Sequence, residues 1–243
     1  MLNLTETRNM ENKSFNSIEL SIVIPTLGRE TLIKTLQSLT LMPREPSWEV
    51  IVVGKISDVS IRQRMQEISV TLPYFTHLDV SFEKGDSSLK KNAGFNVGKG
   101  RIVAFLDDDV IVGEEWTKKI MEPFKDDSVG LISGPALIPE DVSFLARMAG
   151  LALASPAAGY VAFRYKKVEE VRKIVWSSII GCNMAYRREV FKMMGGFDPS
   201  FWPGEEMLAA FRTQKLGYNI LFNSGAVVYH YPRGSIKDFC RQI

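Results

Sequence analysis

Residues 101–112 read Arg-Ile-Val-Ala-Phe-Leu-Asp-Asp-Asp-Val-Ile-Val, and this stretch decides the fold. Its first six residues are mostly apolar, with two β-branched side chains, which is typical of a strand buried on both faces of a parallel sheet. Three carboxylates, Asp107, Asp108 and Asp109, follow at once, and their mutual repulsion would cost stability in a purely structural role. A solvated acidic turn is the alternative, but such a turn seldom follows a buried strand. The stretch therefore favours a bound divalent cation that takes oxygen ligands, Mg²⁺ or Mn²⁺.

Strands and helices alternate through the first half of the chain. Short apolar runs predict strands at residues 20–25, 49–53, 78–82 and 101–106. Apolar residues at helical spacing predict helices at residues 30–39 and 61–68. Because parallel strands need helical crossovers, the alternation predicts an α/β fold with a mainly parallel, doubly wound sheet and helices on both faces. Ligands of such sheets bind at the carboxyl ends of the strands.

The second half of the chain follows a different pattern. It predicts strands at residues 129–133, 219–222 and 226–231, and helices at residues 115–124, 187–194 and 205–216. Residues 139–175 show no clear period and mix apolar stretches with basic clusters, which indicates an insertion or a lid. No internal repeat or low-complexity linker divides the chain. We therefore expect a flexible polar tail at residues 1–17 and a single domain at residues 18–243.

The bulk composition argues against several classes of protein. The 30 basic and 28 acidic residues leave a net charge of +2, so no broad surface for nucleic acid is expected. Cys182 and Cys240 form no CxxC pair, which argues against a disulfide framework and a cysteine zinc site. The N-terminal residues lack the apolar core of a signal peptide, and no run is long enough to span a membrane. A cytoplasmic location fits these features best.

Further segments occur in a defined order around the acidic stretch. They are Ser-Ile-Val-Ile-Pro-Thr-Leu-Gly-Arg at 21–29, Lys-Asn-Ala-Gly at 91–94, Gly-Cys-Asn-Met-Ala-Tyr-Arg-Arg at 181–188, Gly-Gly-Phe-Asp at 195–198, Gly-Glu-Glu at 204–206 and Val-Val-Tyr-His at 227–230. In this order and spacing, the chain resembles the family-2 glycosyltransferases with the GT-A fold, from Leu20 to Tyr231. The resemblance implies a metal-dependent enzyme that transfers a sugar from a nucleotide-diphosphate donor to a hydroxyl group, with inversion at the anomeric carbon. The expected halves are 18–112 for the nucleotide sugar and 113–243 for the acceptor.

The same resemblance implies which residues bind the donor. Pro25 and Thr26 end the first strand at the expected ligand edge, where the segment up to Arg29 can meet the base and the ribose. Lys91 would face the nucleotide or its phosphates, and Asn92 offers both a hydrogen-bond donor and an acceptor. A solvated helix charge is the alternative for Lys91. Nearby, Gly94 would permit close packing of the helix.

The metal site is implied by the acidic stretch and a distant histidine. Asp107 would hold the ribose or sugar side of the donor and share the metal with Asp109. Asp108 counts among the donor residues, but alternate residues of an extended chain lie on opposite sides, so its side chain is expected to point elsewhere. His230 would complete the site as a neutral imidazole, which suits Mn²⁺, and a hydrogen-bonded structural role is the alternative. His77 has no such context and is expected to be structural.

The catalytic base is implied by the acidic pair at the start of a predicted helix. Glu205 and Glu206 follow Gly204, and the positive end of a helix favours carboxylates whatever their role. In the family, the second acid of this pair, usually aspartate, accepts a proton from the acceptor hydroxyl. Glu206 is therefore the candidate base and Glu205 the second candidate. The metal and Lys91 would neutralise the departing diphosphate while Glu206 deprotonates the acceptor on the opposite face of the sugar.

Two departures from the family's pattern leave the substrate open. The family commonly has an acidic cluster after the second strand that binds the base, but here the chain continues Gly-Lys-Ile-Ser-Asp at residues 54–58. Asp58 or backbone groups would have to take that role. Glu206 is also one methylene longer than the usual aspartate. A UDP- or GDP-linked donor is favoured, and a non-catalytic relative that binds a nucleotide sugar or a glycan is the rival function.

The acceptor is expected to be a glycan or a lipid-linked glycan. Residues 142–153 are apolar except for Ser143 and Arg147, and several basic residues follow them: Arg164, Lys166, Lys167, Arg172 and Lys173. Apolar side chains beside cations favour an anionic membrane surface. An ordinary buried lid helix is the alternative. If the membrane interpretation holds, the protein acts at the inner face of the membrane.

Overall fold

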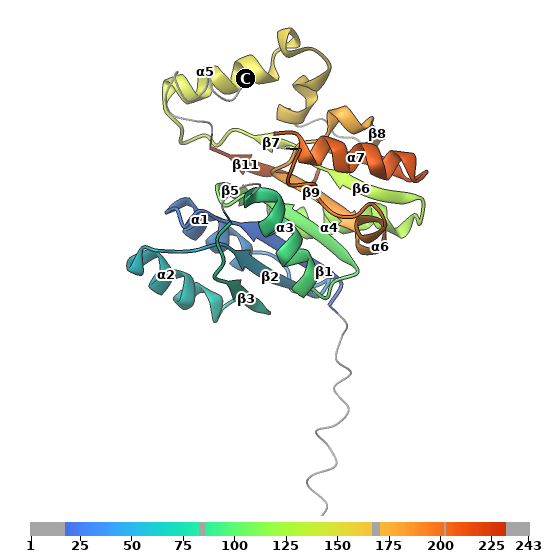
Figure 1. Cartoon of the computed structure of the whole chain (residues 1–243). Coiled ribbons are helices and arrows are strands. Elements are labelled where there is room, and N and C mark those ends of the chain that lie inside the picture. The colour runs from blue at the N-terminus through green and yellow to red at the C-terminus, as the bar shows by residue number, and fades with distance from the viewer. Residues whose placement is uncertain (1–17, 83–85, 167–170, 202, 232–243) are drawn as a thin grey trace, which may run out of the picture.

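The computed structural model describes residues 18–82, 86–166, 171–201 and 203–231, and the predicted N-terminal tail lies outside these ranges. Within them, a mixed sheet in the order β3-β2-β1-β4-β9-β6-β10-β8 forms the central layer (Figure 1). β9 is antiparallel to β4 and β6, β8 is antiparallel to β10, and the other pairs are parallel. The strands are β1 (Leu20–Pro25), β2 (Trp48–Val53), β3 (Phe75–Leu78), β4 (Ile102–Leu106), β6 (Val129–Ser133), β8 (Val171–Lys173), β9 (Asn183–Arg187) and β10 (Asn219–Asn223).

Helices cover both faces of this sheet because successive residues of its buried strands point to opposite sides. Ile22 and Ile102 face α1 (Thr31–Thr40), α2 (Val59–Ser69) and α4 (Trp116–Met121) within one apolar cluster. Val23 and Phe105 belong to a second cluster on the other face. The elements that pack there are α3 (Asp86–Val97), α6 (Arg188–Met193) and α7 (Glu205–Lys215). The predicted α/β fold with a doubly wound, mainly parallel sheet is therefore confirmed.

A second, smaller sheet connects distant parts of the chain. It consists of β5 (Val110–Val112), β11 (Val228–His230) and β7 (Ala136–Leu137), in the order β5-β11-β7. β11 is antiparallel to β5 and parallel to β7. The register pairs His230 with Val110, the residue that follows Asp109. This pairing brings the end of the described chain beside the acidic stretch.

α3 lies close to β1 because Gly94 has no side chain. A Cβ at Gly94 would come within 2.4 Å of Val23 Cγ1, so a larger residue would push the helix away from the sheet. This agrees with the close packing expected at Gly94. Lys91 lies about one turn earlier on the same helix. The close approach therefore carries Lys91 into the interior, where its side chain is only 2% exposed.

Some predicted boundaries are wrong. The third strand is Phe75–Leu78 rather than residues 78–82, because these four residues pair in register with Val50–Val53 of β2. Residues 139–175, which showed no clear period and were interpreted as an insertion or a lid, contain α5 (Phe144–Ala154), η2 (Pro156–Tyr165) and β8. The remaining 3₁₀ segments are η1 (Glu122–Lys125) and η3 (Trp176–Ser178).

Figure 1 shows α5 at one end of the molecule, far from β2 and β3. In the described ranges, no helix combines the length and apolar character needed to cross a membrane.

Asn183 ties the central sheet to the smaller sheet. The residue is fully buried, and its Oδ1 accepts a hydrogen bond from Trp116 Nε1 at 2.9 Å. Its Nδ2 donates to the carbonyl oxygens of Pro135 at 3.0 Å and Ala226 at 2.7 Å. Pro135 and Ala226 lie just before β7 and β11. One amide therefore fixes the entry of the chain into both strands.

Asn183→Ala should lower the free energy of unfolding by at least about 2 kcal/mol, because three buried polar groups lose their partner. Urea denaturation of the metal-free protein measures this loss. Asn219→Ala is the control: its amide donates to Ser128 Oγ at an exposed position, so its loss should cost less than about 0.5 kcal/mol. Equal losses in the two variants would contradict the role assigned to Asn183.

Candidate active site

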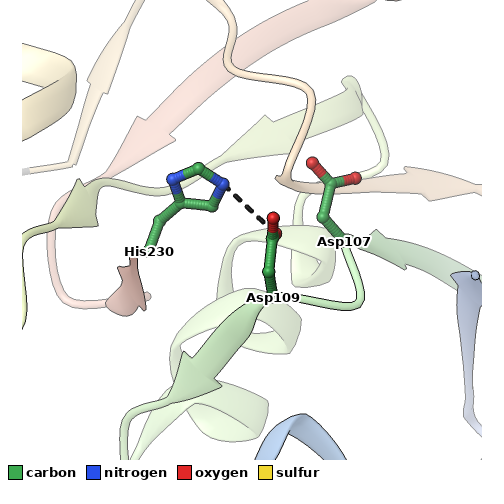
Figure 2. Close-up of side chains that lie close together, drawn as sticks. All are labelled: Asp107, Asp109 and His230. Atoms are coloured by element: carbon green, nitrogen blue, oxygen red, sulfur yellow. Dashed lines mark ion pairs between the residues drawn. The ribbon is translucent and has the colours of Figure 1, made fainter. Parts of the chain in front are cut away.

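Asp107, Asp109 and His230 converge at the carboxyl end of β4 (Figure 2). Each offers one ligand atom, and these atoms all lie within 4.8 Å of one another. Asp109 Oδ1 lies 3.2 Å from His230 Nε2. Two carboxylate oxygens and an imidazole nitrogen are a donor set that suits Mn²⁺ and, with more oxygen ligands from a substrate, Mg²⁺. The residues present therefore fit the predicted cation.

The charges at this cluster explain why a cation would be favoured there. Burial raises the pKa of Asp107 to about 6, although Lys91 opposes this shift and Asp109 adds to it. Burial also disfavours the ionised form of Asp109, but His230 and Arg29 outweigh that effect and lower the pKa of this carboxyl. Arg29 Nη1 lies 3.8 Å from Asp109 Oδ2, and about half of the Arg29 side chain is exposed. Arg29 therefore lies at the rim of the cluster.

Asp108 points away from the cluster, as expected from its position between two ligand candidates. Its Oδ2 accepts hydrogen bonds from Thr26 Oγ1 at 2.6 Å and from Leu27 N at 3.2 Å. The Thr26 hydroxyl in turn accepts a hydrogen bond from Gly28 N at 2.9 Å. Asp108 and Thr26 were both predicted to bind the donor. In the structure their side chains hold the loop after β1 in place, and Pro25 ends that strand at the same edge.

Lys90 anchors the same loop, a role that the sequence analysis missed. Its Nζ donates to the carbonyl oxygen of Thr26 at 2.8 Å and to the carboxylate of Asp86. The Lys90 side chain is 5% exposed. The spacing of four residues between Asp86 and Lys90 was the available signal, because such pairs meet on one face of a helix.

Lys91 is buried against the acidic pair at the start of α7. Its Nζ lies 2.6 Å from Glu206 Oε1 and 3.9 Å from Glu205 Oε1. Burial alone would lower the pKa of Lys91, but Glu206 and Asp107 outweigh it and raise the pKa above its ordinary value. Burial likewise disfavours ionised Glu206, yet Lys91 lowers the pKa of that carboxyl. The alternative of a solvated helix charge is therefore excluded, and Lys91 faces Glu206 rather than open solvent.

The two candidate bases occupy different environments. The Glu206 side chain is 20% exposed, whereas that of Glu205 is 3% exposed and accepts a hydrogen bond from Gly204 N at 3.2 Å. Burial and repulsion from Glu206 raise the pKa of Glu205. A Cβ at Gly181 would come within 2.7 Å of Glu206 Oε1, so the glycine makes room for this carboxylate. Of the pair, Glu206 is the one that lines a cavity shared with Asp107 and His230.

A cavity of about 250 Å³ joins the cluster to Glu206. Gly150 and Leu153 of α5 and Tyr165 of η2 line part of it, so the segment interpreted as an insertion or a lid contributes to this cavity. A larger groove of about 860 Å³ beside β5 contains none of the predicted site residues. The smaller cavity is lined by Asp107, Ala136, Ile138, Gly150, Leu153, Tyr165, Ile180, Gly181, Cys182, Glu206 and His230.

Three further side chains singled out from the sequence have structural partners. The amide of Asn92, predicted to bind the donor, donates to the carbonyl oxygen of Phe197 at 2.8 Å and accepts from Phe197 N at 3.0 Å. Asp58 caps α2 by accepting hydrogen bonds from Ser60 N and Ile61 N. His77 Nε2 lies 2.9 Å from the carbonyl oxygen of Gly54, which fits the structural role expected for it. Both polar groups of Asn92 are thus engaged, and it ties α3 to the loop before α7.

The sequence matches a family model described as "Glycosyltransferase like family 2" over residues 18–243. The chain belongs to this family. Its match to ExoM, a succinoglycan biosynthesis protein of Rhizobium meliloti, has 27% identity over 121 residues, which are 49% of this chain and 39% of ExoM. It is 22% identical to a glucosyl-dolichyl phosphate glucuronosyltransferase of Haloferax volcanii, over 88% of this chain and 69% of that protein. The predicted family is confirmed.

Solved structures of glycosyltransferases share the fold of this family-2 chain. A mannosyltransferase of Pyrobaculum calidifontis, solved with GDP-Man and Mn²⁺, superposes with a TM-score of 0.64 at 18% identity, over 88% of this chain and 56% of that one. S. aureus TarS 1–349, solved with UDP-GlcNAc, superposes with a TM-score of 0.67 at 15% identity, over 90% of this chain and 60% of that one. The predicted GT-A fold is therefore confirmed. This chain spans little more than half the length of these neighbours.

Lys91→Met should destabilise the protein by roughly 3 kcal/mol at pH 8, because it leaves Glu205 and Glu206 in the interior without their cation. Without Lys91, burial raises the pKa of both carboxyls above the unfolded value. The folded variant then binds more protons than the unfolded chain, so its deficit should grow as the pH rises from 5 to 8. Urea denaturation at both pH values measures this.

Lys118→Met is the control for this experiment. Lys118 Nζ lies 4.0 Å from Glu115 Oε1, and both side chains are 67% exposed, so the loss should stay below about 1 kcal/mol at either pH. The double variant Lys91→Met/Glu206→Gln should recover part of the lost stability, since only Glu205 then remains as an unpaired buried charge. A deficit in Lys91→Met that does not change with pH would contradict the role of the two glutamates.

Proposed function

We propose that this chain is a metal-dependent, inverting glycosyltransferase that moves a sugar from a nucleotide-diphosphate donor to a hydroxyl group. One observation carries the proposal: Asp107 and His230 of the candidate metal cluster line the same cavity as Glu206, the candidate base. A cation site for a diphosphate and a carboxylate for an acceptor hydroxyl are the two parts that a single displacement needs.

The cation would be held by Asp109, Asp107 and His230, and Mn²⁺ or Mg²⁺ suits these ligands. When bound, such an ion supplies Lewis-acid stabilisation of the leaving diphosphate. The structural neighbour from Pyrobaculum calidifontis was solved with Mn²⁺ and GDP-Man, which supports this choice of cofactor and donor class. Arg29, at the rim of the cluster, would add positive charge beside the phosphates.

The donor would lie along the carboxyl ends of β1 and β4. Pro25 and Thr26 end β1, and the loop that they begin is fixed by Asp108 and Lys90. Because Asp58 is committed to capping α2, recognition of the base would fall to backbone groups around Gly54. The neighbours hold GDP-Man in one case and UDP-GlcNAc in the other, so we assign a GDP- or UDP-linked sugar as the donor.

Glu206 would accept the proton of the acceptor hydroxyl as that oxygen attacks the anomeric carbon. Glu206 has the ionised carboxylate that a base needs, and its ion pair with Lys91, which lowers its pKa, limits its strength as a base. Lys91 holds the carboxylate at 2.6 Å and so orients it. Attack from the face opposite the leaving diphosphate inverts the anomeric centre.

The acceptor class is a glycan or a lipid-linked glycan. Succinoglycan biosynthesis and a dolichyl phosphate substrate appear in the names of two relatives, which supports polysaccharide or glycan assembly. We place this reaction in the cytoplasm, at the inner face of the membrane.

A non-catalytic protein that binds a nucleotide sugar or a glycan is the second candidate. The ion pair between Glu206 and Lys91 favours it, because a carboxylate paired with an ammonium group is a weaker base. Incubating the purified protein with a panel of UDP- and GDP-sugars, Mn²⁺ and glycan acceptors distinguishes the two. Metal-dependent release of the nucleoside diphosphate supports the enzyme. Donor binding without any release or transfer supports the second candidate.

Asp109→Asn should reduce transfer by at least about 10²-fold, because the diphosphate would then lose the main ligand of its counter-ion. The Mn²⁺ affinity of the variant, measured by calorimetry without donor, should fall in parallel while its melting temperature is retained. Asp126→Asn is the control, since Asp126 is an exposed side chain that accepts a hydrogen bond from Ser128 N at 2.9 Å. Full activity of folded Asp109→Asn in the presence of EDTA would refute the metal proposal.

Glu206→Gln should leave donor affinity intact while transfer falls by about 10²–10⁴-fold, because the amide keeps the shape of the carboxylate but cannot accept the proton. Glu205→Gln is the matched control and should be milder, since Glu205 does not line the cavity. Single-turnover rates with saturating donor give the comparison. A wild-type rate for Glu206→Gln would exclude it as the base, and the larger loss in Glu205→Gln would transfer the role to Glu205.

A further inference from the structure

The cavity beside Glu206 has the size and lining of a site for one small ligand. Its volume of about 250 Å³ falls just below the roughly 300–1,000 Å³ of sites for drug-sized molecules, so it has room for one sugar ring but not for a nucleotide sugar. Asp107, Glu206 and His230 supply the few polar groups that orient a ligand. Much of the remaining lining is apolar and includes Ala136, Ile138, Leu153 and Ile180.

The cavity lies on the acceptor side of the candidate active site. Pro25, Thr26 and Arg29, which would bind the donor, are not among the described residues that line it, whereas Glu206, the proposed base, is. Apart from Asp107, Glu206 and His230, the described lining comes from residues 136–182, on or beside β7, α5, η2 and the start of β9. A sugar in this cavity would therefore be the one whose hydroxyl group meets Glu206.

The charged side chains of the cavity disfavour an anionic sugar. Asp107 and Glu206 line it, and no lysine or arginine occurs in the described part of the lining. The nearby cations face other groups: Lys91 is buried against Glu206, and Arg164 donates to the carbonyl oxygens of Ser177 and Ser178. Even with Asp107 compensated by a metal ion, Glu206 has to be ionised to act as a base. A uronic acid or a phosphorylated sugar would therefore meet a like charge.

Tyr165 is the aromatic side chain in the described lining of the cavity. The face of an aromatic ring is negative and attracts the weakly positive C–H groups that cover one face of a sugar ring. The phenol can also donate and accept a hydrogen bond. Burial raises the pKa of Tyr165, so the hydroxyl keeps its proton at neutral pH and adds no charge to the cavity.

We propose that this cavity binds one uncharged sugar ring of the acceptor, and that Tyr165 is a specificity-determining residue on which this ring packs. The inference rests on the proposed function for the assignment of the sugar to the acceptor. The binding itself requires neither donor nor metal, so it can be measured apart from transfer.

Saturation-transfer difference NMR of the full chain in EDTA tests the proposal without catalysis. The probes are the methyl glycosides of glucose, galactose and mannose, each paired with its methyl uronide. At least one neutral glycoside should bind, and its affinity should be at least tenfold higher than that of the matched uronide at low salt, because the added carboxylate faces Glu206. The preference should remain with Mg²⁺ present. No binding at tens of millimolar, or equal binding within each pair, would overturn the proposal.

Tyr165→Ala should weaken binding of the neutral glycoside about fivefold, because the ring that contacts the sugar is lost. Tyr165→Phe should retain most of the affinity, since the ring stays. Tyr74→Ala is the control: it removes a tyrosine that is 52% exposed and lies outside the described lining of the cavity, so binding should not change. In transfer assays, Tyr165→Ala should raise the KM of the acceptor and leave that of the donor unchanged. Unchanged binding in Tyr165→Ala would exclude the residue from the sugar site.

The outcomes separate this inference from the proposed function. If only the proposed function is wrong, the preference for a neutral glycoside and its loss in Tyr165→Ala persist while no donor is consumed. If only the inference is wrong, transfer persists while Tyr165→Ala leaves the KM of the acceptor unchanged. Displacement of the bound glycoside by GDP-mannose or UDP-GlcNAc would assign the cavity to the donor sugar and would also overturn the inference.

Discussion

The buried carboxylates at the edge of the sheet depend on the ammonium group of Lys91. It lies 2.6 Å from Glu206 and 3.9 Å from Glu205, and Asp107 is near enough to help raise its pKa. Carboxylates removed from water are costly unless a cation compensates them. The Lys91 side chain reaches the interior because Gly94 lets α3 pack closely against β1. Close packing at Gly94 thus places Lys91 where it stabilises the buried carboxylates even without a bound metal.

The metal cluster depends on strand register rather than on neighbouring residues. Asp107 and Asp109 follow β4 directly, whereas His230 arrives from the other end of the described chain. Pairing of β5 with β11 sets His230 opposite Val110, and Asn183 fixes the entry to β11 through the carbonyl of Ala226. A shift of one residue in this pairing would turn the imidazole to the other face of the sheet. The smaller sheet is therefore a support for the site as much as part of the fold.

The alternation of strands and helices and the acidic stretch could be predicted from local patterns in the sequence, whereas the role of His230 was implied only by the family resemblance. Contacts between side chains far apart in the sequence could not be predicted. Nothing in the sequence tells which of the adjacent Lys90 and Lys91 faces the acidic pair, yet in the structure Lys90 binds the loop after β1 and Lys91 binds Glu206. α5 entered the prediction only as a buried lid helix, the alternative to a membrane surface, because a helix that is apolar on both faces shows no helical period. Asp58 was readable as a helix cap, since aspartate before a helical run is a common N-terminal signal.

The length of Glu206 follows from the space around it. Gly181 leaves room where any side chain would approach Oε1 to within 2.7 Å, and Lys91 lies at hydrogen-bond distance from the same oxygen. An aspartate at this position would withdraw its carboxylate by about one bond length, which is large against the roughly 1 Å tolerance of a catalytic contact. It would also leave Lys91 without its nearest partner. The glycine, the lysine and the longer acid therefore act as one unit, and a change in any one of them moves the carboxylate that faces the cavity.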